Sequence, residues 1–211
     1  MRKSLVVFDF DGTLADTFQL FLKTFDAVAK IYGFRAFDRD KMDLLRTMEA
    51  SEVLKYHGVP FWKLPAIART TRRFMAREIG GVNLIDGLET ALESLHEAGY
   101  TLAILTSNSK QNVESVLGQE RIRLFSHFEC GVSILTKRQS LRKVMRALGA
   151  SQDHTSFVGD ELRDLRAAKA LGVRFGAVAW GYNSMDCLIA HGAEDRFHSA
   201  LDLTNRFCRE R

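Results

Sequence analysis

The sequence predicts an α/β fold: a parallel β-sheet core with an all-helical segment inserted after the first strand. Short apolar runs alternate with helical segments of about ten residues, which is typical of βαβ units and a parallel sheet. The exception is the stretch 17–79, which has helical spacing only. We therefore expect a core at 1–15 and 82–211 and a helical cap at 16–81.

The first strand is expected at Leu5–Phe10, because this run is short, apolar and rich in β-prone residues. In the inserted segment, apolar residues recur at helical spacing in three stretches, which are 18–29, 44–54 and 62–79. After Gly80 and Gly81 the alternation begins. Its expected strands are 100–106, 128–132, 155–159, 173–179 and 195–198. Its expected helices are 87–98, 112–117, 140–148, 162–171 and one after residue 199.

Composition limits the class of protein. The chain has 211 residues, of which 46% are hydrophobic and 27% charged, as in a globular domain with a small accessory module. Asp9 and Asp11 interrupt the first apolar run, which is too short for a signal peptide, and no run is long enough to span a membrane. The three cysteines are widely spaced and odd in number, as free thiols in a reducing compartment would be. The expected location is the cytoplasm.

The excess positive charge is confined to one segment. Residues 16–84 contain 12 Lys and Arg against 8 Asp and Glu, and the rest of the chain contains 18 of each. The segment is either a solvated helical face or a surface that attracts an anionic substrate. No basic run is dense enough to predict nucleic acid as the main partner.

Two acidic residues stand where the first strand ends, in the string Asp9-Phe-Asp11-Gly-Thr-Leu-Ala-Asp16. Carboxylates two residues apart at such a point can face one pocket, where they repel each other unless a cation is bound. All-oxygen ligands favour Mg²⁺. An ordinary Asp-Gly turn is the alternative for an isolated Asp-x-Asp, but the full string is far more specific.

This string resembles the first motif of the haloacid dehalogenase-like (HAD) superfamily. The resemblance implies a Rossmann-like parallel-sheet core, with Asp9 as the nucleophile and Asp11 as the general acid and base. It also implies Mg²⁺ as the cofactor. Asp11 argues against dehalogenation, because the dehalogenases of that family lack an acid at this position.

Three later motifs follow in the order that the resemblance implies. Thr106 ends a strand, and its hydroxyl with the N–H groups near Ser107 and Asn108 could hold a phosphate, although Thr before a helix is often only an N-cap. Lys137 is the best-placed third motif, with Arg138 and Lys143 as alternatives.

The fourth motif is Gly159-Asp160-Glu-Leu-Arg-Asp164, and capping with surface charge is its alternative explanation. By the resemblance, Asp160 ligates Mg²⁺ together with Asp9 and the backbone carbonyl of Asp11, and Asp164 supports the site by orienting its neighbours. Downstream, the string Trp180–Ser184 is similar to the loop that follows this motif in phosphoglycolate-phosphatase-like members.

The motif spacing places the insertion after the first motif, because 97 residues separate Asp9 from Thr106 and only 31 separate Thr106 from Lys137. An all-helical insertion there resembles the cap of the phosphoglycolate phosphatase and phosphoglucomutase branch, which closes over the pocket and selects the leaving group. Arg46 aligns with the substrate-specificity loop of that branch, although the usual glycine is absent from 45–51. A merely exposed arginine is the alternative.

The sequence thus predicts a magnesium-dependent phosphatase that hydrolyses a small phosphate monoester through an aspartyl-phosphate on Asp9. Phosphoglycolate, a sugar phosphate and a nucleotide all fit a basic cap, so a small phosphorylated metabolite is the expected partner. A phosphomutase of the same family is one alternative. A regulatory or partner-binding protein with residual phosphatase activity is the alternative from another class.

Overall fold

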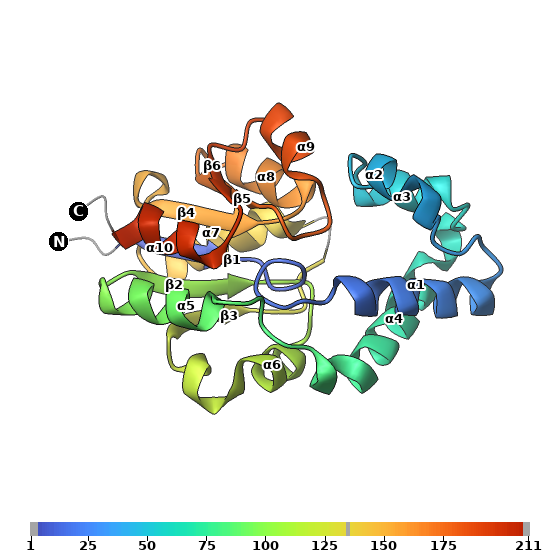
Figure 1. Cartoon of the computed structure of the whole chain (residues 1–211), viewed down its shortest axis with the longest axis horizontal. Helices are drawn as coiled ribbons and strands as arrows, with labels where there is room; N and C mark the ends of the chain where they lie inside the picture. Colours follow the sequence, from blue (N-terminus) through green and yellow to red (C-terminus); the bar gives the residue numbers. More distant parts are fainter. Residues whose placement is uncertain (1–3, 134–135, 209–211) are drawn as a thin grey trace.

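A computed structural model describes residues 4–133 and 136–208 of the chain. Its described strands form one parallel six-stranded sheet in the order β3-β2-β1-β4-β5-β6 (Figure 1). The strands are β1 (Leu5–Phe8), β2 (Thr101–Leu105), β3 (Phe125–Glu129), β4 (Thr155–Gly159), β5 (Arg174–Val178) and β6 (Asp195–Phe197). The predicted α/β, Rossmann-like class with an inserted helical segment is confirmed.

The position of β1 in the sheet decides where the polar strand ends meet. β1 lies between β2 and β4, and Phe8 is in register with Ile104 on one side and Val158 on the other. Parallel neighbours bring their carboxyl ends to one edge of the sheet, where ligands bind in folds of this kind. Asp9, Thr106 and Asp160 follow these three strands and therefore share one edge.

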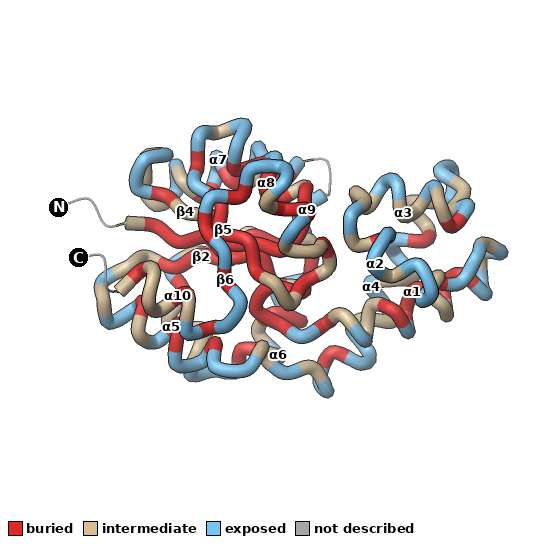
Figure 2. The backbone as a smooth tube through the Cα atoms, turned by 45° about the horizontal axis from the view of Figure 1, so that its top comes forward, coloured by how far each residue is buried: buried red, intermediate tan, exposed pale blue. Residues whose placement is uncertain are grey.

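Helices cover both faces of the sheet, as the alternation of side chains along a strand requires. In β1, Val6 and Phe8 pack on one face, and Leu5 and Val7 pack on the other. The first face is covered by α5 (Leu88–Glu97), α6 (Lys110–Ile122) and α10 (Ala200–Cys208). The second is covered by α7 (Lys137–Ala147), α8 (Leu162–Lys169) and α9 (Met185–Ala190). Figure 2 shows the strands as the buried centre of this layered core.

The segment between β1 and β2 is a separate group of helices beside the carboxyl edge of the sheet (Figure 1). It consists of α1 (Phe18–Tyr32), α2 (Met42–Leu45), α3 (Ala50–Tyr56) and α4 (Leu64–Glu78), joined by short 3-10 turns. Its own small core is built from Leu22, Phe25, Phe37 and Leu45. This segment is called the cap below.

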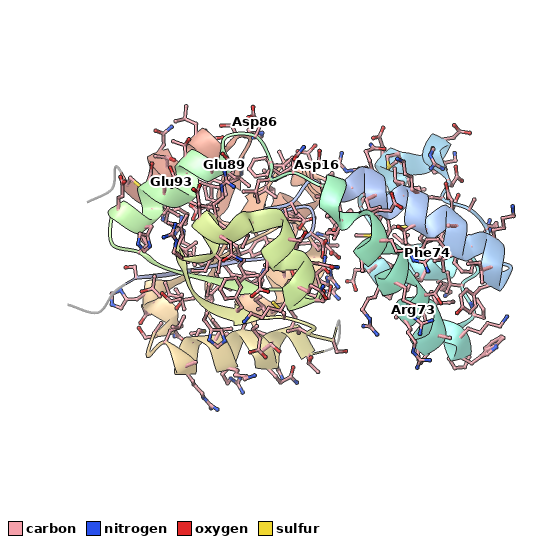
Figure 3. The ribbon with its side chains drawn as sticks, turned by 90° about the horizontal axis from the view of Figure 1, so that it is seen from below. Asp16, Arg73, Phe74, Asp86, Glu89 and Glu93 are labelled. Atoms are coloured by element: carbon pink, nitrogen blue, oxygen red, sulfur yellow. The ribbon has the colours of Figure 1, made fainter. Side chains whose placement is uncertain are left out.

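The two connections between the cap and the sheet lie side by side. Ala15 and Leu84 form an antiparallel bridge, and the N–H of Asp16 donates to the carbonyl of Asn83 at 3.0 Å. Figure 3 shows Asp16 at this junction, with Arg73 and Phe74 on α4 in the cap and Asp86, Glu89 and Glu93 on the core side.

Three elements differ from the expectation. β3 begins at Phe125 rather than near residue 128, because the buried ring of Phe125 anchors the strand start in the core. The preceding helix is interrupted by a kink at Gly118, where φ is 70°, and a second helical stretch follows as far as Ile122. The helix α9 was not expected, because six residues are too few to show a clear period.

Within the described part of the chain, no helix is both long and apolar enough to cross a membrane. In the same described residues, Cys130, Cys187 and Cys208 form no disulfide.

Asp195, the first residue of β6, binds arginine side chains of β5 and α10, and these contacts allow a test of the core packing. Its carboxylate accepts two hydrogen bonds of 2.6 Å from Arg174 and one of 3.0 Å from Arg206. Burial alone would raise the pKa of Asp195, but the two guanidinium groups outweigh burial and lower it below 3.8. The ionised carboxylate therefore stabilises the fold above that value, and the contribution is lost as the pH falls through the lowered pKa.

We predict that Asp195→Asn lowers the free energy of unfolding by about 1.5–3 kcal/mol at neutral pH, the range for hydrogen bonds to a charged group. The difference from the parent protein should shrink when unfolding is measured below pH 4. A gap that does not change between pH 7 and pH 3 would contradict the assignment.

Candidate active site

Asp9 follows the last residue of β1, and hydrogen bonds from its backbone and its side chain hold it in place. Its N–H donates to the carbonyl of Val158 at 2.9 Å, which continues the pairing with β4. One carboxylate oxygen accepts from the N–H of Phe10 at 2.8 Å, and the other accepts from the Nζ of Lys137 at 2.6 Å. Burial alone would raise the pKa of this carboxyl, but the charges of Lys137 and Arg163 and the hydrogen bonds to the carboxylate together outweigh burial and lower it. Asp9 is therefore an ionised, oriented carboxylate.

Lys137 is 4% exposed and stands at the first position of α7. Its Nζ forms ion pairs with Asp9 and Asp164, and these two carboxylates raise its pKa although burial acts in the opposite direction. The two alternatives lie elsewhere. Lys143 is exposed and pairs with Glu129 at 2.8 Å, and Arg138 is exposed. Of the three candidates, Lys137 is the one whose described ion pairs are with Asp9 and Asp164.

Carboxylates from the end of β1, from the loop after β4 and from the first turn of α8 form one buried cluster. Oxygen atoms of Asp9, Asp160 and Asp164 lie within 4.8 Å of one another. Asp160 accepts hydrogen bonds from the hydroxyl of Thr13 at 2.7 Å and the N–H of Tyr182 at 2.8 Å. Burial, followed by the neighbouring carboxylates, raises its pKa well above the usual range. Its ionised form thus requires additional positive charge close by.

A divalent cation would supply that charge, and the donor set fits one. The cluster offers only oxygen ligands, which Mg²⁺ prefers. The carboxylate of Asp11 is not among the clustered groups that the described residues form, and the predicted role of its backbone carbonyl as a metal ligand stays a prediction.

Asp11 is turned toward the end of β2 and held there by Asn108. The side-chain amide of Asn108 donates to both carboxylate oxygens, at 3.0 and 3.2 Å. Burial, and then the charge of Asp9, raise the pKa of Asp11 to about 6. The turn depends on Gly12, because φ is 71° and a Cβ there would lie 2.5 Å from a carboxylate oxygen of Asp160. A carboxyl group with this pKa can both give and accept a proton near neutral pH.

Thr106, Ser107 and Asn108 lie in the loop between β2 and α6. Thr106 is fully buried, and its hydroxyl oxygen accepts from the N–H of Asn108 at 3.0 Å. The cap of α6 is instead Ser109, whose hydroxyl accepts from the N–H of Asn112 at 3.2 Å. The N-cap explanation for Thr106 is therefore wrong, while the roles of all three residues in phosphate binding stay a prediction.

Arg46 lies on the cap between α2 and α3 and is not merely exposed. Its guanidinium donates to the carbonyl oxygens of Gly181 at 2.9 Å, Tyr182 at 3.2 Å and Ala179 at 3.4 Å, all in the loop after β5. Its predicted role in substrate specificity stays a prediction.

The loop 179–184 contributes residues that the motif search did not single out. Besides holding Asp160 through its N–H, Tyr182 bonds the hydroxyl of Thr17 at 3.0 Å and packs its ring against Phe18 and Phe21 of α1. The signal was present in the sequence as the string 180–184, but only the fold shows what it contacts.

Known proteins agree with this arrangement. The family model described as haloacid dehalogenase-like hydrolase matches residues 6–178. A phosphoglycolate phosphatase of Synechococcus elongatus is 31% identical over 186 residues, which cover 88% of each chain. A pyrophosphatase PpaX of Bacillus cereus is 26% identical over 212 residues, which cover 96% of this chain and 95% of the pyrophosphatase. The crystal structure of a predicted phosphatase from Clostridium acetobutylicum has the same fold, with a TM-score of 0.83 at 20% identity, covering 99% of this chain and all of the other. The chain belongs to the haloacid dehalogenase-like hydrolase family, and the expectation of a HAD-like hydrolase is confirmed.

Proposed function

We propose that this chain is a magnesium-dependent phosphatase that hydrolyses a small phosphate monoester through an aspartyl-phosphate on Asp9. The observation that carries the proposal is the pair of unlike carboxyls at the end of β1. Asp9 is ionised and oriented by Lys137, whereas Asp11 has a pKa of about 6 and is held aside by Asn108. Two neighbouring acids with separated pKa values are suited to a nucleophile and a general acid.

In the first step, a carboxylate oxygen of Asp9 attacks phosphorus in line and the bond from phosphorus to the ester oxygen breaks. Asp11 gives its proton to the departing alkoxide. In the second step, Asp11 takes a proton from water, the water oxygen attacks the phosphorus of the aspartyl-phosphate, and phosphate leaves with Asp9 restored.

Positive charge and hydrogen-bond donors stabilise the phosphoryl oxygens, which is the main requirement of phosphoryl transfer. Lys137 supplies charge from one side, and the Thr106 hydroxyl with the N–H groups near Ser107 and Asn108 would hold the transferred group. Mg²⁺, held by Asp9, Asp160 and the backbone carbonyl of Asp11, would neutralise the remaining charge when bound. Asp164 fixes Lys137 through their ion pair.

For the substrate, we propose a small phosphorylated metabolite. Residues 16–81 would act as the cap and residues 1–15 with 82–211 as the catalytic core, and the excess positive charge at 16–84 would draw an anion to the space between them. The names of the two relatives add phosphoglycolate and pyrophosphate as candidates.

The test is a panel of 2-phosphoglycolate, pyrophosphate, sugar phosphates and nucleotides, assayed with Mg²⁺ and ranked by kcat/KM. One compound turned over well above the rest would support a dedicated phosphatase. Turnover of none except at unphysiological concentration would favour a partner-binding protein.

Replacing the nucleophile gives the first prediction for this site. Asp9→Asn should lower kcat by about 10⁴-fold or more, because the amide cannot attack phosphorus. Asp16→Asn is the matched control, since Asp16 is an exposed acid of the same motif and should leave kcat within about threefold of the parent. Activity near the parent level in Asp9→Asn would refute the mechanism.

The proton-transfer role of Asp11 gives a second prediction. Asp11→Asn should lower kcat/KM for an alkyl phosphate by about 10²–10⁴-fold, the usual range for general acid catalysis. The loss for p-nitrophenyl phosphate should be much smaller, because that leaving group departs without a proton. Equal losses for both esters would show that Asp11 has another role.

Metal dependence gives a third prediction with a readout besides activity. Mg²⁺ at about 100 times its Kd should stabilise the folded protein by about 2.7 kcal/mol and raise its Tm. Asp160→Asn should need a higher Mg²⁺ concentration for the same shift, whereas Asp195→Asn should respond as the parent does. A Tm that Mg²⁺ does not change in the parent protein would contradict the metal site.

A further inference from the structure

The cap and the core meet at a small polar interface beside the acidic cluster. On the cap side lie residues 46–49, between α2 and α3. On the core side lies the loop 179–184, which follows β5 and carries the N–H that holds Asp160. The N–H of Ser184 donates to the carbonyl of Arg46 at 2.9 Å, so the two loops are joined by backbone as well as side chains.

Arg46 joins the loops from the cap side. Its guanidinium donates to carbonyl oxygens of Ala179, Gly181 and Tyr182, and these acceptors come from one short turn of the core. Hydrogen bonds from an ionised donor are the stronger kind. Each of them exists only while the cap lies on the core.

Asn183 joins them from the core side and is 5% exposed. Its side-chain amide N–H group donates to the carbonyls of Arg46 at 2.9 Å and Met48 at 2.8 Å. Its side-chain oxygen accepts from the N–H of Leu162 at 2.9 Å, at the start of α8, and its own N–H donates to the carbonyl of Asp160 at 3.1 Å. One side chain therefore contacts the cap and the loop that carries Asp160.

We propose that Arg46 and Asn183 are positioning residues that latch the cap onto the core and couple its closure to the Asp160 loop. The coupling to catalysis rests on the phosphatase function proposed above, but the latch itself does not. The guanidinium of Arg46 donates to core carbonyls. Its loss should therefore lower kcat/KM by a similar factor for all substrates. A residue that reads one substrate would instead change the order of preference among them.

Arg46→Ala tests the latch, with Arg46→Lys as the conservative variant that keeps the charge. Arg166→Gln is the matched control, because Arg166 pairs with Glu49 across the same interface without contacting the loop 179–184 in the described structure. Two quantities are measured: hydrogen exchange at the amide of Ser184, and kcat/KM over the phosphate ester panel.

In Arg46→Ala, exchange at Ser184 should rise about tenfold, the effect of losing a hydrogen bond to a charged group. kcat/KM should fall by a similar factor for every ester, and Arg46→Lys should recover part of both effects. In Arg166→Gln, both quantities should stay near parent values. Unchanged exchange at Ser184, or a loss confined to one ester, would overturn the latch.

Asn183→Asp tests separately the contact of Asn183 with the cap and its contact with the start of α8. The carboxylate keeps an acceptor for the N–H of Leu162 but faces the carbonyls of Arg46 and Met48 with an oxygen, which repels them. Exchange should therefore rise at Ser184 while the Leu162 amide stays protected, and Asn183→Ala should expose both. If the Ser184 and Leu162 amides exchanged equally in both Asn183→Asp and Asn183→Ala, the role of Asn183 would be refuted.

If the parent protein shows no turnover of any ester, the proposed function fails, but the exchange data still decide whether the latch exists.

Discussion

The buried ion pairs of Lys137 with Asp9 and Asp164 are the interaction on which the site depends. Transferring charged groups from water into a protein interior costs several kcal/mol for each group. Their mutual attraction offsets this cost only when the geometry of the contact is good. Here the first residue of α7 places an ammonium group between a carboxylate from β1 and one from α8. The same contact, together with the charge of Arg163, lowers the pKa of Asp9 where burial alone would raise it. Removing the lysine would leave two buried acids without their ion-pair partner.

The strand order explains how this contact arises. With β1 between β2 and β4, the residues after three strands meet at one edge, and the first residue of α7 brings the ammonium group of Lys137 to the same place. The helical insertion leaves and re-enters the core beside Asp16 and Asn83, close to the end of β1. A movement of the cap, as proposed above, would therefore be transmitted next to Asp9 and, through the loop 179–184, to Asp160.

Much of this was predictable because the strongest signals are local. The string from Asp9 to Asp16 combines a strand, a turn and two acids, and the alternation after Gly80 predicted the parallel sheet. What the sequence could not show are contacts between distant segments. The amide of Asn108 holds Asp11 across 97 positions, and Arg46 bonds a loop more than 130 positions away. No local pattern predicts such partners, and the early start of β3 likewise follows from the packing of Phe125 in the core.

The most direct test of the account is to find the phosphoryl group on the protein. Asp11→Asn protein would be incubated with p-nitrophenyl phosphate and Mg²⁺ and reduced with borohydride, which converts an aspartyl-phosphate to homoserine. Peptide mass spectrometry then locates the homoserine. The account predicts it at position 9 and at no other aspartate. Its absence there, or its presence at another position, while the parent protein releases phosphate from the same ester, would contradict the assignment of Asp9 as the nucleophile.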